Sequence, residues 1–164
     1  MSTAAIQKKI KLDKIDRKIL NDLQSNGRMT NVELANHAGI SAPPCLRRVR
    51  ALEENNIIEG YFANLNAKKL GFGVTVFATV RLKEQNDNDV LEFEKIIAAN
   101  DLIREAYVIS GDYDFMLKIV ARDWDEYQDF LSNNLTRIAN VASVRSSMKV
   151  KTSKFQPGVP IDLD

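Results

Sequence analysis

The chain of 164 residues contains only one cysteine, Cys45, and only one histidine, His37. A single cysteine cannot form an intrachain disulfide, and it cannot supply the several thiolates of a cysteine-rich zinc site. General-base catalysis and metal ligation by His37 both need a second positioned group, and the pattern around this residue provides none. We therefore predict no metal site.

The sequence also lacks long apolar runs. No stretch approaches the ~20 apolar residues that a membrane-spanning helix needs. Residues 1–13 contain no continuous apolar segment, so no signal peptide is expected. Apolar residues nevertheless make up 45% of the chain, which is enough for a packed core. We expect a cytoplasmic protein without a membrane partner.

Net charge is also nearly absent, at +1, and this would ordinarily argue against a nucleic-acid partner. The average hides an asymmetry, because residues 1–70 hold 12 basic and 7 acidic side chains, whereas residues 71–164 hold 11 and 15. A basic first part joined to an acidic second part indicates a nucleic-acid-binding domain followed by a domain with another task. A polar, glycine-containing stretch separates them, so we predict domains over 1–66 and 67–164.

Three helices are predicted in the first domain, over residues 13–26, 30–38 and 41–55. The first begins after Asp13, a favourable N-cap. Thr30 and Glu33 have the spacing of a capping box, and Gly39 is suited to end the second helix. Two short helices joined through a tight turn are typical of a helix-turn-helix. The following residues, 57–66, are predicted to be extended and to form a small wing or a connector strand.

The third helix has two contrasting faces. Cys45 lies on the apolar face with Val49 and Leu52, so we expect it in the core. The opposite face carries small residues at its start and arginines further along, and these suit close approach to a DNA groove and contact with phosphates or guanine edges. An arginine-bearing face is most often only a solvated surface, but the turn and the basic domain favour DNA binding. The predicted DNA-binding residues are Ser41, Pro43, Pro44, Arg47, Arg48 and Arg50.

Ser41 has an unusual position in this set. It is the expected N-cap of the third helix, but prolines at 43 and 44 remove the backbone N–H groups that an N-cap side chain normally binds. We therefore predict that the Ser41 hydroxyl is free to contact a DNA phosphate.

The second domain has the predicted order βαββαβ, with strands over 74–82, 103–110, 114–121 and 141–151 and helices over 89–99 and 124–137. This ferredoxin-like arrangement is an α+β fold with two helices on one face of an antiparallel sheet. The other face would expose Phe77, Met116 and either Tyr107 or Val108, which is too apolar for solvent. Pairing of two sheets in a homodimer would cover it and would supply a second helix-turn-helix about one DNA turn away.

The segment Ser110–Asp114, with the sequence Ser-Gly-Asp-Tyr-Asp, allows three interpretations. Gly-Asp is ordinary hairpin-turn chemistry. A metal site would need further ligands. A ligand loop is the third interpretation, since free backbone N–H groups beside carboxylates suit the carboxylate and ammonium groups of an amino acid. Spacing alone favours the plain hairpin.

Several motifs in combination resemble the Lrp/AsnC (feast/famine) family of transcription regulators, over about residues 11–155. They are Leu12–Leu20, Asn26–Arg28, Thr30–Ala35, Ser41–Glu53, Ile58–Tyr61 and Ser110–Asp114. The resemblance implies a winged helix-turn-helix followed by the ligand-binding βαββαβ domain called RAM. It also implies dimers that assemble further, frequently into octamers that wrap DNA, and a response to an amino acid, often leucine or another apolar one.

The resemblance also changes the interpretation of the loop, because effectors of the family bind near it. The effector-binding residues that it implies are Gly111, Asp112, Tyr113, Asp114, Thr136, Ile138 and Ser147. We therefore expect a sequence-specific transcriptional regulator that responds to an amino acid and has no other cofactor. The alternative is an architectural, chromatin-like protein that wraps DNA with little specificity and no effector. An enzyme is not predicted, since paired carboxylates in an apolar setting, a nucleophile with a base, and a glycine-rich phosphate loop are all missing.

Overall fold

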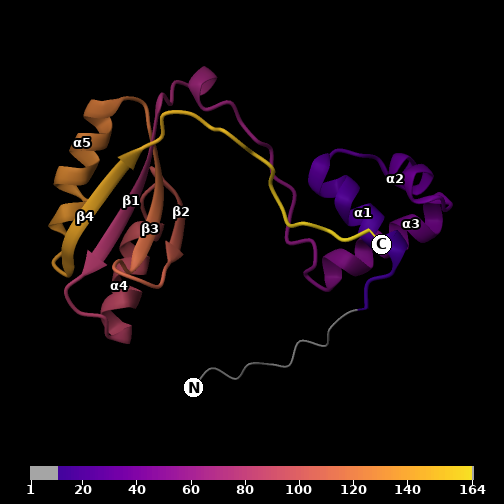
Figure 1. The fold of residues 1–164 in the computed structure, drawn as a ribbon, viewed down its shortest axis with the longest axis horizontal. Helices are drawn as coiled ribbons and strands as arrows, with labels where there is room; N and C mark the ends of the chain where they lie inside the picture. The colour runs from indigo at the N-terminus through magenta and orange to yellow at the C-terminus, as the bar shows by residue number, and fades with distance from the viewer. Residues whose placement is uncertain (1–10, 164) are drawn as a thin grey trace. The chain divides into compact units, whose positions relative to one another are not determined.

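A computed structural model describes residues 11–163, which form two units (Figure 1). Of these residues, the helical unit contains 11–64 together with 154–163, and the sheet unit contains Leu65–Ser153. The division near residue 65 lies close to the boundary proposed from the sequence. The carboxyl-terminal tail differs from that proposal, because it belongs to the helical unit and hydrogen-bonds to its first helix.

Within its described residues the helical unit has three helices, α1 (Lys14–Ser25), α2 (Asn31–Ala38) and α3 (Ala42–Glu54). Their predicted starts are confirmed, since Asp13 caps α1 and Thr30 forms a capping box with Glu33 at α2. Gly39 ends α2 in the left-handed conformation, with φ 73°, which favours glycine. The core of the unit consists of the buried residues Ile19, Leu23, Leu34, Ala35, Ala38, Cys45 and Leu52. Cys45 is therefore a core residue, as the helix periodicity predicted.

The segment that follows α3 is not the connector strand that the sequence predicted. The structure assigns no strand to residues 57–66, and a short 3-10 helix, η1, follows at Lys68–Leu70. An extended segment becomes a strand only when another strand pairs with it, and within residues 11–163 none does. Phe62 in this segment is 92% exposed.

The sheet unit has the predicted order βαββαβ. Its elements are β1 (Val74–Leu82), α4 (Asp87–Ala98), β2 (Ile103–Val108), β3 (Phe115–Ala121), α5 (Trp124–Asn133), the 3-10 helix η2 (Leu135–Arg137) and β4 (Val141–Met148). The strands lie in the order β2-β3-β1-β4, and every neighbouring pair is antiparallel. The fold is thus α+β, with a ferredoxin-like sheet.

The two faces of the sheet differ in what covers them. On one face, Val80 and Leu117 pack with Phe93 of α4 and Tyr127 of α5 in the main core. The other face carries Phe77, Met116 and Tyr107, and Phe77 and Tyr107 are 38% and 49% exposed. The register decides between Tyr107 and Val108, because Tyr107 lies opposite Met116 whereas Val108 lies opposite the buried Phe115. We call the uncovered side the open face.

Among the described residues, no helix combines the length and apolar character that crossing a membrane would require.

Candidate DNA interface and effector site

Helix α3 presents most of the predicted DNA-binding residues on one exposed face. Ser41, Pro43, Arg47 and Arg50 are exposed, and Pro44 is half-buried. The side chains of Arg47 and Arg50 form no hydrogen bond or ion pair with any described residue. Two guanidinium groups without partners are available to bind phosphates or base edges.

Ser41 has the geometry that its sequence context predicts. It is the N-cap of α3, with φ −78° and ψ 158°, but its side chain makes no capping hydrogen bond. The cause is proline in the first turn, since proline has no N–H to donate. The hydroxyl is exposed, so the predicted local structure is confirmed, and its contact with DNA stays a prediction.

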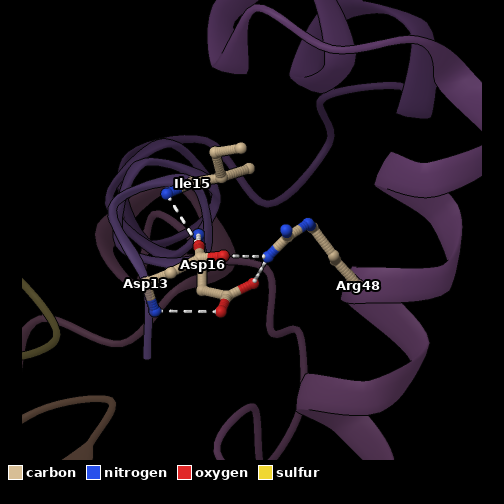
Figure 2. Close-up of polar contacts among 4 residues, drawn as sticks. All are labelled: Asp13, Ile15, Asp16 and Arg48. Atoms are coloured by element: carbon tan, nitrogen blue, oxygen red, sulfur yellow. Dashed lines mark hydrogen bonds and ion pairs between the residues drawn. The ribbon is translucent and has the colours of Figure 1, made fainter. Parts of the chain in front are cut away.

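Arg48, unlike Arg47 and Arg50, contacts the start of α1, as Figure 2 shows for Arg48. Its Nη1 atom donates to Asp13 Oδ2 and to Asp16 Oδ1, both at 2.7 Å. Its side chain is 30% exposed, and its guanidinium group is directed to α1. The sequence pattern groups Arg48 with the DNA-binding residues. In the structure its long side chain reaches the neighbouring helix, so Arg48 links α3 to α1.

Asp13 and Asp16 connect this ion pair to the start of α1. Asp13 Oδ1 accepts hydrogen bonds from the Ile15 and Asp16 N–H groups, both at 2.9 Å, and Asp16 Oδ2 accepts from the Asp13 N–H at 3.1 Å. The Asp16 N–H, followed by Arg48, lowers the pKa of Asp13, and hydrogen bonds to Asp16 and Asp13 raise the pKa of Arg48. The same carboxylates therefore cap α1 and hold α3.

The sequence showed the cap at Asp13 but not this link to Arg48. The spacing of Asp13 and Asp16 does place two carboxylates in the first turn of a helix. Their partner lies 35 residues from Asp13 along the chain, and only the packing of α3 against α1 brings it there.

The far end of α3 is held by a second polar contact. The Tyr61 hydroxyl donates to Glu53 Oε1 at 2.9 Å. Burial, together with the Glu53 carboxylate, raises the pKa of Tyr61 to about 12, because both disfavour the phenolate. This contact attaches the extended segment after α3 to the helix.

In the sheet unit, Asp114 forms part of the framework of the loop. Its carboxylate Oδ2 accepts from the Leu82 N–H at 2.7 Å, and its own N–H donates to the Val80 carbonyl at 2.9 Å. Gly111 has φ 127°, a conformation that side chains disfavour. Asp112 is exposed and Tyr113 is half-buried. The loop is therefore a tight connection tied to the end of β1, with Asp112 directed to solvent.

The other predicted effector residues lie in two places. Ile138 packs against the core, and its carbonyl accepts from the Val141 N–H at 2.9 Å. Val141 pairs with Leu82, the residue that binds Asp114, so Ile138 and the loop lie at the same end of the sheet. Thr136, nearby in η2, donates to the Leu131 carbonyl at 2.9 Å.

Ser147 is not brought to that end. It lies opposite Phe77 in the β1–β4 register, which places it on the open face of the sheet. The structure therefore groups the loop with Thr136 and Ile138, and it separates Ser147 from them.

A cleft of about 590 Å³ lies between α4 and the segment that follows α5. Buried Phe93 and Leu135 line it together with the charged residues Asp89, Glu92 and Arg137. Of the seven predicted effector residues, only Ile138 lines this cleft. No local pattern predicts this cleft, because it forms only where α4 and η2 lie on the same face of the sheet. No group of three or more His, Cys, Asp or Glu side chains within the described part of the chain is arranged to hold a metal ion.

Comparison with known families gives one match for each unit. Residues 12–59 match the model of a winged helix-turn-helix DNA-binding domain, and residues 75–159 match the model of the Lrp/AsnC ligand binding domain. The first match lies within the helical unit, and the second covers most of the sheet unit and extends into the tail.

Individual relatives agree with these matches. The chain is 48% identical over 146 residues to the leucine-responsive regulatory protein of Rhizobium meliloti, covering 89% of this chain and 94% of the relative. It is 39% identical over 150 residues to the Bkd operon transcriptional regulator of Pseudomonas aeruginosa, covering 92% and 98%.

Solved structures are similar as well. A transcriptional regulator of Neisseria meningitidis in complex with L-Met superposes with a TM-score of 0.89 at 30% identity, covering 93% of this chain and 98% of that one. AsnC of Escherichia coli superposes with a TM-score of 0.82 at 27% identity, covering 92% and 100%. With a DNA-binding helical unit, an amino-acid-responsive ligand domain and no enzymatic activity, this chain belongs to the Lrp/AsnC family of transcriptional regulators.

Proposed function

We propose that the protein binds operator DNA by placing α3 in the major groove, with Ser41, Pro43, Pro44, Arg47 and Arg50 facing the DNA. The observation that carries this proposal is the exposure of Arg47 and Arg50 without partners among the described residues. Arg48 keeps its place in the interface as a positioning residue, because α1 carboxylates already bind its guanidinium group. We expect this DNA binding to take place in the cytoplasm.

Binding to selected DNA tests this interface. Fragments that the wild-type protein enriches from a random pool serve as operators, and scrambled fragments of equal length serve as the reference. A specificity ratio of order a thousand or more supports sequence reading, whereas a ratio near unity favours the architectural alternative. The logarithm of the binding constant falls linearly with the logarithm of the salt concentration. Each phosphate contact that a variant loses should make this slope shallower by about one unit.

The effector in this proposal is an apolar amino acid such as leucine. The names of two relatives support this class, since one is a leucine-responsive protein and the other was crystallised with L-Met. We place the effector at the loop Gly111–Asp114, with Thr136 and Ile138 beside it at the same end of the sheet. The exposed Asp112 carboxylate is suited to bind the ammonium group of the effector.

Thermal unfolding in the presence of each of the twenty amino acids tests the effector proposal. A ligand at ~100 times its dissociation constant adds roughly 2.7 kcal/mol of stability, which gives a clear rise in Tm. For an amino acid that stabilises the wild type, Asp112→Ala tests the loop and Arg137→Ala tests the cleft. A smaller shift in Asp112→Ala alone supports the loop. A smaller shift in Arg137→Ala alone would move the site to the cleft.

The proposed assembly is a homodimer formed through the open face of the sheet, and these dimers join into higher oligomers, of which an octamer is expected.

 The open face carries the apolar residues Phe77, Tyr107 and Met116. Exposed apolar surface of this kind is typical of an interface, and this supports the choice of the open face for the dimer. The Glu105–Lys118 ion pair lies on the same face, and its N–O distance is 2.5 Å.

Molar mass in solution tests the assembly. Phe77→Asp places a charge in the proposed interface, and Leu91→Asp makes the same kind of change on α4, where Leu91 is 51% exposed. Light scattering after size exclusion should give a lower mass for Phe77→Asp and an unchanged mass for Leu91→Asp. Equal masses for both variants and the wild type would contradict a dimer through the open face.

A further inference from the structure

The carboxyl-terminal tail returns to helix α1. The Val159 N–H donates to Gln24 Oε1 at 3.2 Å, and Arg17 Nη1 donates to the Asp162 carbonyl at 2.9 Å. Arg17 and Gln24 lie two turns apart on α1, so the tail runs along the helix and does not merely touch its end. Ile161, between the two contacts, is half-buried, whereas residues 149–160 are all exposed.

Gly158 allows the close approach at the start of this contact. Its φ is 89°, a conformation that favours glycine. A Cβ atom at this position would overlap Gln24 Oε1 and would lie 3.1 Å from Gln24 Cδ. The backbone conformation therefore favours glycine, and a side chain here would displace the Gln24 amide oxygen that accepts from the Val159 N–H.

The tail gives the chain a second covalent path between its two units. The first path runs from Ile58, which packs on the helical core, to Gly73, whose N–H donates to the Arg122 carbonyl. The second runs from Lys149, whose N–H donates to the Thr75 carbonyl, to Val159. A fully extended chain spans at most about 50 Å over the fifteen residues of the first path and about 35 Å over the ten residues of the second. A docked tail is therefore the shorter tether.

We propose that α1 carries a docking surface, made by Arg17 and Gln24, whose occupant is the segment Gly158–Leu163 of the same chain. The docked segment acts as a strap that limits the movement of the DNA-binding unit relative to the ligand-binding unit. Arg47 and Arg50 on α3 stay exposed with the tail in place, so the strap restrains the unit without covering the DNA interface. A restrained unit has less conformational freedom to lose when it binds DNA, and this raises affinity.

The docking itself is tested in the full chain with Gly158→Val, and Gly71→Val is the matched control. Gly71 has a similar φ of 86°, but a Cβ there meets no atom within 4 Å. A nitroxide label on Leu163→Cys reports the mobility of the tail, and Cys45 does not compete for the label because it is buried. We expect the label to move at least about threefold faster in Gly158→Val than in Gly71→Val. Equal mobility in the two variants would overturn the docking.

The strap's effect is tested by the affinity for operator DNA. We expect Gly158→Val to bind about three- to tenfold more weakly than Gly71→Val, because the released unit has to be ordered on the DNA. Equal affinities would overturn the strap. This second test rests on the proposed DNA interface, whereas the mobility test does not. Failure of the wild type itself to bind operator DNA would count against the interface and would leave the mobility result standing.

Discussion

The helical and sheet units place their candidate functional side chains in opposite ways. In the helical unit, Arg47 and Arg50 have no partners within the described chain, and the neighbouring Arg48 makes the bonds to α1. In the sheet unit, Asp114 is a candidate effector residue and also the acceptor for the Leu82 N–H. Binding and folding are thus carried by different arginines in one unit and by the same aspartate in the other.

This difference decides how variants of the two units should be interpreted. An exposed side chain without partners can be removed at little cost in stability, usually within about 0.5 kcal/mol. Removing the acceptor of the N–H of a buried residue such as Leu82 leaves that group unsatisfied and destabilises the fold. A loss of function at α3 therefore reports on binding, whereas a loss at Asp114 mixes binding with folding.

The largest effect is expected from the double variant Arg47→Ala/Arg50→Ala. Each arginine contact to DNA contributes about 1–3 kcal/mol, so the pair should lower operator affinity by on the order of a hundredfold or more. Fluorescence anisotropy with labelled operator measures the affinity, and urea unfolding should show unchanged stability. Lys95→Ala, which removes an exposed charge from α4, should leave affinity unchanged. If the double variant binds as tightly as Lys95→Ala, then α3 does not contact DNA.

The second largest effect is expected from Asp114→Ala, on stability. The Leu82 N–H loses its acceptor at 2.7 Å, which should lower the free energy of unfolding of the sheet unit by about 1–2 kcal/mol. The single tryptophan, Trp124, lies in α5, so its fluorescence follows this unit during urea unfolding. Asp112→Ala in the same loop should change stability by less than about 0.5 kcal/mol. Equal stability of the two variants would mean that the Asp114 carboxylate is not part of the framework.

Features set by neighbours in the sequence were predictable. The caps at Asp13 and Thr30 depend on residues three positions away, and the alternation in Val74–Leu82 reports directly on the two faces of a strand. Ser41 belongs to this group as well, because the prolines that leave its hydroxyl uncapped are two and three residues away.

Features set by contacts between distant segments were not predictable. The partner of Asp13 is 35 residues away and the partner of Gln24 is 135 residues away, so neither the Arg48 ion pair nor the docked tail leaves a local pattern. The choice between Tyr107 and Val108 depends on the β2–β3 register, which shifts between Ile103 and Glu105. For the same reason, Ser147 could not be assigned to the open face before its strand partner, Phe77, was known.

A smaller effect is expected from Arg48→Met, on the stability of the helical unit. The variant keeps much of the aliphatic stem but loses both hydrogen bonds to Asp13 and Asp16, and we expect a loss of about 1 kcal/mol. Arg47→Met is the matched control and should have no effect on stability. Circular dichroism at 222 nm follows the helices, and Trp124 fluorescence should be unchanged because it reports the sheet unit.

The pH dependence of this effect has a definite sign. The pKa of Asp13 is lowered below its usual 3.8 by the Asp16 N–H and by Arg48, so the ionised carboxylate stabilises the fold above that pH. The contribution is lost as the pH falls through the lowered pKa. The difference in stability between the wild type and Arg48→Met should therefore shrink below pH 3.8. A difference that stays constant down to pH 2 would mean that Arg48 acts through packing of its stem and not through its charge.

The smallest effect is expected from Tyr61→Phe. The variant removes the 2.9 Å hydrogen bond to Glu53, and because Tyr61 is 46% exposed we expect a loss of only about 0.5 kcal/mol at neutral pH. Alkaline pH provides a sharper test. The pKa of Tyr61 is raised from 10.0 to about 12, so the unfolded chain releases this proton at lower pH than the folded chain. The stability that the Tyr61 hydroxyl contributes is therefore fully present below pH 10.0, and it should decline as the pH rises from 10.0 to about 12.

Urea unfolding of the wild type and Tyr61→Phe across this alkaline range measures the decline. The variant has no phenol at position 61, so its stability should fall less steeply than that of the wild type. Glu53→Gln is the intermediate case, since an amide oxygen still accepts the hydrogen bond but carries no charge to oppose the phenolate. Its slope should lie between the other two. If all three proteins lose stability in parallel, the Tyr61 hydroxyl is not held against α3, and the segment after the helix would then be attached only by the packing of Ile57 and Ile58 on the helical core.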